Sequence, residues 1–172
     1  MSEQHTSNNG SRFHAGMLIP TRGNNAVATS LFEELPSTSP NLGSMEGDRM
    51  RVYSPRSGVD LESLMSLGPP EALGGEVLSG EPQLYGRFDF REGNVAAGVF
   101  RATTGRIRVT FPFTEHATII EGKVTLTDET GKTYTYKAGD SYFIRQGSVI
   151  LWDVKGAYVV KSFFNVTEPA AQ

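Results

Sequence analysis

HATIIEGKVTLTDETGKTYTYKAGDSYFIR, residues 116–145, is the stretch that decides the fold. Short runs rich in Val, Ile, Thr, Tyr and Phe alternate there with glycine-containing turns, which is typical of antiparallel strands. Asp128-Glu129-Thr130-Gly131 separates two of these runs. A type I turn with Gly131 in the left-handed conformation would join them as a hairpin. The stretch predicts strands at 116–120, 123–127, 132–137 and 141–145.

The same pattern extends in both directions from this stretch. It predicts further strands at 84–90, 96–102, 106–111, 149–153 and 158–165. No long helical pattern separates the strands, so they pair antiparallel and form a sandwich or a barrel. We therefore expect an all-β protein with one antiparallel sandwich or barrel over residues 84–166 and a short tail at 167–172.

The N-terminal part of the chain has a different composition. Residues 1–50 are rich in Ser, Asn, Gly and Thr and predict a flexible arm, with one short apolar run at 27–35. Residues 51–83 are expected to be a linker that carries a short helix or helical turn. Its pattern begins with Asp60 as a cap, continues with an apolar stripe that includes Leu64, and stops at Gly68-Pro69.

Composition excludes several classes of function. The 172 residues include no Cys and three His, and the net charge is −3. Disulfides and thiolate chemistry are therefore excluded, and no basic excess favours nucleic acid or an anionic membrane as a partner. No apolar run approaches the ~20 residues that span a bilayer, and the polar N-terminus does not resemble a signal peptide. We expect a soluble, cytoplasmic protein.

Two motifs carry a family resemblance. The first is FPFTEHATIIEGKV at 111–124, and the second is AGDSYFIRQGS at 138–148. In this order, with one hairpin between them, they resemble the two conserved motifs of cupins. Together with Trp152 and Lys161, the pattern is similar to the cupin branch that includes ureidoglycine aminohydrolase-like proteins and the ethanolamine-utilisation cupin. The resemblance covers roughly 84–165. It implies a single small antiparallel β-barrel of the jelly-roll type that handles a small amine- or ureide-containing metabolite.

The metal ligands of that family are mostly missing. The motif glutamate matches Glu115, but the position of the second-motif histidine holds Ile150. The two first-motif histidines fall on Arg108 and Thr110, or, with a shorter spacing, on Val109 and Phe111. One carboxylate alone does not hold a transition metal tightly, so we expect no metal and no other cofactor. His116 adjoins Glu115 and points to the opposite face of a regular strand.

Glu115 is the candidate catalytic residue, as an acid/base or as the partner of a substrate amine. A buried carboxylate needs a cation, and Arg108 is the first choice if the longer spacing holds, with Lys161 second. Under the shorter spacing Arg108 lies on the surface. The candidate ligand-binding residues are Arg108, Thr110, Tyr142, Trp152 and Lys161. The sequence is equally consistent with Trp152 as a residue that only fills the core, and with Lys161 as an ordinary surface residue.

Three kinds of function remain open from the sequence. The barrel could be an enzyme without a conventional metal, a non-enzymatic module for a small ligand, or part of a protein assembly. Sheet edges of a small barrel usually need cover, and the apolar segments 27–35 and 61–67 could cross onto a second copy. We therefore expect a homodimer.

Overall fold

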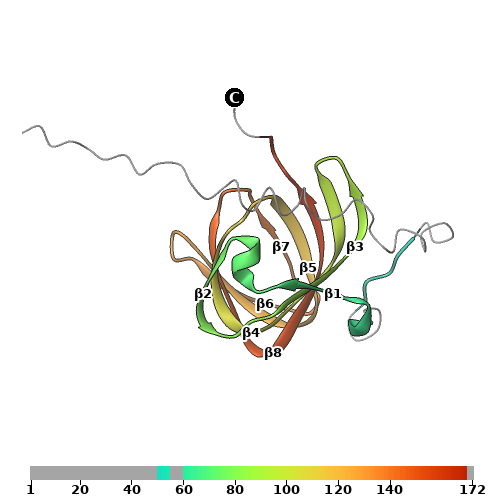
Figure 1. Ribbon diagram of the computed structural model, residues 1–172. Coiled ribbons are helices and arrows are strands. Elements are labelled where there is room, and N and C mark those ends of the chain that lie inside the picture. The colour runs from blue at the N-terminus through green and yellow to red at the C-terminus, as the bar shows by residue number, and fades with distance from the viewer. Residues whose placement is uncertain (1–49, 55–59, 170–172) are drawn as a thin grey trace, which may run out of the picture.

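One curled antiparallel sheet makes up most of the computed structural model, which describes residues 50–54 and 60–169 (Figure 1). The expected flexible arm and the apolar run at 27–35 lie outside the described residues, apart from Met50. The strands are β1 (Met65–Gly68), β2 (Gly75–Gly80), β3 (Leu84–Glu92), β4 (Val95–Thr110), β5 (Thr114–Asp128), β6 (Thr133–Lys137), β7 (Ser141–Ile144) and β8 (Val149–Val166). The all-β class and the antiparallel pairing agree with the prediction.

Three long strands, β4, β5 and β8, build the barrel. The sequence predicts two shorter strands in the place of each. Strand β8 lies between β4 and β5 along its whole length. The first half of β4 pairs with β3 and its second half with β2. The first half of β5 pairs with β7 and its second half with β6. The long strands therefore pass from one layer of a jelly roll to the other.

Glycines mark the places where the long strands change layer. Gly105 and Gly122 have φ values of 154° and 76°, and the ladder shifts register beside both. In β8, residues 155–157 fall between the two paired halves. Such bulges also change which residues of the alternating pattern face inward.

The predicted hairpin between β5 and β6 is confirmed. The Gly131 amide donates to the Asp128 carbonyl at 3.0 Å, and Gly131 has a φ of 85°. The Asp128 carboxylate accepts the backbone amides of Thr130 and Lys132 at 2.9 and 3.0 Å. These contacts set the register of the hairpin.

The segment before residue 84 contributes more to the sheet than the sequence indicated. Of the predicted helix or helical turn, one 3-10 turn forms, η2 (Leu61–Ser63), and Met65–Gly68 is a strand instead. A second 3-10 turn, η3 (Pro70–Leu73), connects β1 to β2. The four apolar positions of the predicted helix are too few to stabilise it, and Met65–Gly68 pairs with β3 as a strand instead. In Figure 1 the β1–η3 segment crosses the front of the barrel.

A second, smaller apolar cluster lies on the outer face of the sheet. Leu64, Val99, Ile120 and Val160 are buried there, and Tyr53 packs against them. The Tyr53 hydroxyl donates to the buried Asp89 carboxylate at 2.7 Å. These contacts hold the described N-terminal segment, residues 50–54, against its own sheet.

Candidate functional site

A buried ion pair lies inside the barrel. Glu115 comes from β5 and Lys161 from β8, and their side chains are 1% and 6% exposed. Glu115 pairs in the ladder with Asn165, which is two alternations along β8 from Lys161 on the same inner face. The long Lys161 side chain extends diagonally across the two strands, so its Nζ bonds to Glu115 Oε1.

Tyr142 and Asn165 complete the hydrogen bonds of this pair. The Tyr142 hydroxyl donates to Glu115 Oε1 at 2.8 Å and accepts from Lys161 Nζ at 2.9 Å. With its amide nitrogen turned toward the carboxylate, Asn165 donates to Glu115 Oε2 at 3.0 Å. Both carboxylate oxygens are therefore bonded, which offsets the cost of burying the charge. We call Glu115, Tyr142, Lys161 and Asn165 the polar cluster.

Burial shifts the acid–base properties of the cluster. Desolvation lowers the pKa of Lys161, and the Glu115 carboxylate opposes that shift. Desolvation also raises the pKa of Tyr142 well above its ordinary value, and the Glu115 charge adds to the rise. Tyr142 is therefore a neutral hydroxyl at neutral pH, and it can pass a proton only to a partner that it already contacts.

Four aromatic rings surround the lysine. Lys161 Nζ lies 4.9 Å from the ring centroid of Phe100, 5.0 Å from Trp152, 5.5 Å from Tyr142 and 6.0 Å from Phe111. Ring faces attract a cation, most strongly when water is absent. The rings thus stabilise a positive charge at this point of the barrel in addition to Glu115.

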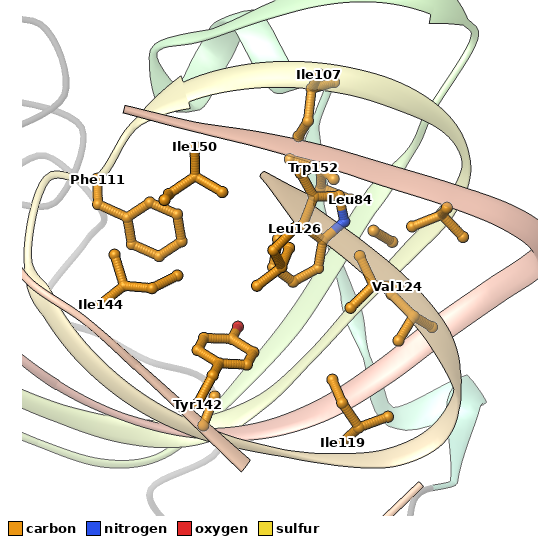
Figure 2. Close-up of a cluster of buried hydrophobic side chains, with 14 residues drawn as sticks. Leu84, Ile107, Phe111, Ile119, Val124, Leu126, Tyr142, Ile144, Ile150 and Trp152 are labelled. Atoms are coloured by element: carbon orange, nitrogen blue, oxygen red, sulfur yellow. The ribbon is translucent and has the colours of Figure 1, made fainter. Parts of the chain in front are cut away.

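An apolar cavity of about 220 Å³ opens beside the polar cluster. Figure 2 shows part of the surrounding core, with the Tyr142 hydroxyl pointing into the barrel. Glu115, Lys161 and Asn165 provide polar wall atoms, and the β1–η3 segment adds Leu67, Pro70 and Leu73. The remaining wall is mostly apolar and includes Leu84, Phe88, Phe100, Ile107, Val109, Phe111, Phe113, Trp152 and Phe163. A cavity with an apolar wall and a few converging polar groups is typical of a small-molecule site.

Two side chains of this wall have hydrogen-bond donors that are not used within the described residues. The indole Nε1–H of Trp152 is buried and has no partner among them. Lys161 has three N–H groups and donates to two acceptors, Glu115 and Tyr142. Buried donors are normally satisfied, so these two invite an acceptor from a bound molecule.

The structure corrects the predicted position of Arg108 and Thr110. Both are exposed, and Arg108 pairs with Glu76 on the outside at 2.8 Å. Val109 and Phe111 face the cavity instead, which is the shorter of the two spacings. The bulge at Gly105 sets this alternation, and only the folded ladder reveals it. The partner of Glu115 is therefore Lys161, the second choice.

The other candidate residues lie in the interior. Tyr142, Trp152 and Lys161 are 5%, 4% and 5% exposed, and they meet around Glu115. Sequence reasoning missed Asn165 and the wall residues before 84. An alternating pattern was visible in Lys161, Phe163 and Asn165, but no motif marked residues 67–73.

The described part of the chain has neither clustered metal ligands nor a membrane-spanning helix. Residues 50–54 and 60–169 contain no group of three or more His, Cys, Asp or Glu placed to hold a metal ion. His116 is exposed, on the opposite face of β5 from Glu115. In the same ranges no helix has the length and apolar character needed to cross a membrane.

Comparisons with known proteins agree with this geometry. Residues 90–163 match the family model described as the EutQ-like cupin domain. A DUF861-family protein of unknown function from Pseudomonas syringae is 26% identical with a TM-score of 0.55, and covers 67% of this chain, while this chain spans about half (52%) of it. The search of curated proteins found no match.

Two ethanolamine-utilisation proteins are similar at lower identity. The EutQ protein of Clostridium difficile is 18% identical with a TM-score of 0.45, covering 50% of this chain and 69% of its own. A putative ethanolamine utilization protein of Salmonella typhimurium is 22% identical with a TM-score of 0.45, covering 62% of this chain and 96% of its own.

The curled jelly roll and its glycine turns define the class of fold: the barrel has a cupin fold. Residues 90–163 are similar to the EutQ-like cupin domain, as residues 111–124 and 138–148 indicated. The fold and this similarity support a role connected with small molecules, and the identity of the molecule has to come from the site.

Proposed function

We propose that the cavity binds a small uncharged molecule with an apolar body and a carbonyl oxygen, as in an amide or a ureide. The observation that carries the proposal is that two side chains lining an apolar cavity, Trp152 and Lys161, each have an unused donor, the indole Nε1–H and one N–H of the ammonium. A carbonyl oxygen has two lone pairs and accepts from both donors. The apolar wall suits the hydrocarbon part of the same molecule.

The charge of the polar cluster argues for a neutral ligand. Glu115 and Lys161 already neutralise each other, and both carboxylate oxygens are bonded. A free amine would bring a second positive charge without an available carboxylate, and burying an unpaired charge is costly. Of the amine- and ureide-containing metabolites that the family resemblance implied, the site favours the ureide.

The proposal is tested with four ligands of similar size: butanamide, butylurea, butylamine and butyrate. Thermal shift and calorimetry should show binding of the amide and the urea only. Trp152→Phe removes one donor and should weaken butanamide binding about five- to tenfold, since one hydrogen bond contributes about 1 kcal/mol. Arg108→Gln, on the outer face, is the control and should leave binding unchanged. Binding of butylamine without binding of the amide would disprove the carbonyl assignment.

A further inference from the structure

We infer that Lys161 forms a Schiff base with an aldehyde or ketone held in the cavity. The inference rests on the carbonyl site of the proposed function and extends its ligands to aldehydes and ketones, because an amide or urea carbonyl is too unreactive for this step. Lys161 becomes the covalent attachment point, and Glu115 accepts its proton and delivers a proton to the carbonyl oxygen.

Position distinguishes Lys161 from the other lysines. Lys123, Lys132, Lys137 and Lys155 are exposed, whereas Lys161 is the one buried lysine within residues 50–54 and 60–169. Its side chain forms part of the cavity wall. A bound carbonyl compound is therefore held next to a single amine, and positioning of this kind accelerates bond formation.

The Lys161 amine must be neutral to attack the carbonyl carbon, and its surroundings allow it to lose a proton. Lys161 Nζ bonds directly to Glu115 Oε1, so one proton can move from the ammonium to the carboxylate without a carrier. The transfer turns two buried charges into two neutral groups, which an apolar wall tolerates better. Burial also lowers the pKa of Lys161, the usual means by which an enzyme activates a lysine amine.

The bond changes balance without an oxidant or reductant. The Lys161 nitrogen adds to the carbonyl carbon as the C=O π bond breaks, and the protonated Glu115, which lines the cavity, donates a proton to the oxygen. The new ammonium returns a proton to the Glu115 carboxylate, and Glu115 passes that proton to the hydroxyl group that leaves. Loss of water then forms the C=N bond. The sum is R–NH₃⁺ plus a carbonyl compound, giving a protonated imine and one water molecule.

The product suits the same surroundings as the free lysine. The protonated imine has the single positive charge that the ammonium had, at the same nitrogen. Glu115 and the rings of Phe100 and Trp152 therefore stabilise it as they stabilise Lys161. No new charge is buried. The imine has a single N–H, so it keeps the hydrogen bond to Glu115 and gives up the one to Tyr142.

Trapping with butanal and sodium cyanoborohydride tests the inference on the wild-type protein. Peptide mapping by mass spectrometry locates the reduced adducts. We expect the adduct at Lys161 to form at least about tenfold faster than at exposed Lys155 on the same strand, and to saturate with butanal. Excess butanamide should block labelling at Lys161 and leave Lys155 unaffected. Glu115→Gln should slow labelling at Lys161 at least about tenfold.

The outcomes separate this inference from the proposed function. If butanamide binds but Lys161 is labelled no faster than Lys155, the Schiff base is refuted and carbonyl binding stands. If Lys161 is labelled and butanamide does not compete, the cavity is not the route and the inference fails. If neither butanamide nor butanal reaches the cavity, both proposals fail together.

Discussion

Folding buries the opposite charges of Glu115 and Lys161 together, so each side chain depends on the other to compensate its charge. Removing one partner of a buried pair leaves the other charge uncompensated, at a cost of about 3–5 kcal/mol. We expect Glu115→Gln and Lys161→Met each to lower the free energy of unfolding by about that amount. The double variant should lose less than the sum, with a coupling energy of about 1–3 kcal/mol.

Urea unfolding of the four proteins in that cycle provides the measurement. Lys155→Met is the matched control, because Lys155 lies exposed on the same strand. It should change the free energy of unfolding by about 0.5 kcal/mol or less. Additive losses for Glu115 and Lys161 would show that the two side chains do not depend on each other in solution.

Arg108 illustrates the opposite situation, a charged pair on the surface. The side chains of Arg108 and Glu76 are 53% and 62% exposed, so water screens their attraction. We expect Arg108→Gln to leave the melting temperature almost unchanged, with a loss of about 0.5 kcal/mol or less. A large loss in thermal denaturation would mean that Arg108 faces the interior after all.

At the scale of elements, the change of layer in β5 depends on Gly122. Its φ is 76°, and a Cβ there would lie 2.3 Å from the Tyr158 carbonyl oxygen. We expect Gly122→Ala to lower the free energy of unfolding by about 2–5 kcal/mol, from backbone strain plus the clash. Gly131→Ala is the control, with φ of 85° and no neighbour near the added methyl, and should lose only about 1–2 kcal/mol. Equal losses in chemical denaturation would refute the close approach.

The segment at 50–54 is held to the sheet by a contact that depends on pH. Burial and the hydrogen bond to Asp89 raise the pKa of Tyr53 to about 12. Between pH 10 and 12 the folded protein therefore keeps a proton that the unfolded chain has lost. The stability that Tyr53 contributes is complete below pH 10 and is lost as the pH rises through about 12.

Tyr53→Phe isolates this effect. The wild type should melt at a higher temperature than the variant below pH 10, and the difference should shrink toward pH 12. Tyr134→Phe serves as the control, since Tyr134 is 56% exposed. A difference between wild type and Tyr53→Phe that stays constant over this pH range would contradict the Asp89 contact.

At the scale of the whole molecule, the outer face carries a row of apolar side chains. The ladder places Phe90 beside Ala97, Ala97 beside Phe164, Phe164 beside His116, and His116 beside Phe143. The three phenylalanines are 43%, 49% and 63% exposed. Monomeric proteins seldom expose large apolar patches, so this row is where we expect a second copy to bind.

Light scattering at micromolar concentration tests the expected homodimer. The wild type should have twice the monomer mass, and Phe143→Ser combined with Phe164→Ser should have the monomer mass. Tyr134→Ser, also an exposed aromatic but outside this row, should remain a dimer. A wild type with the monomer mass would contradict both the expected homodimer and the role of this row as its interface.

Much of the fold, and several residues of the site, could be predicted from the sequence of residues 84–166 alone. Short β-rich runs and turn residues predicted an all-β sandwich or barrel, because strand alternation and glycine turns are local properties of the chain. Motif spacing also indicated the cupin class and marked Glu115, Tyr142, Trp152 and Lys161 as candidates.

Which residues face the cavity was decided only by the tertiary structure. In β8 the inward residues are Ile150, Trp152 and Val154 before Gly156, and odd-numbered ones such as Val159 and Lys161 after it. β4 changes in the same way beside Gly105, and so Val109 rather than Arg108 faces inward. An extra residue in a bulge reverses the two-residue alternation, and its position depends on pairing with strands that are distant in sequence. For the same reason the partner of Glu115, 46 residues away along the chain, follows from the fold and not from the local pattern.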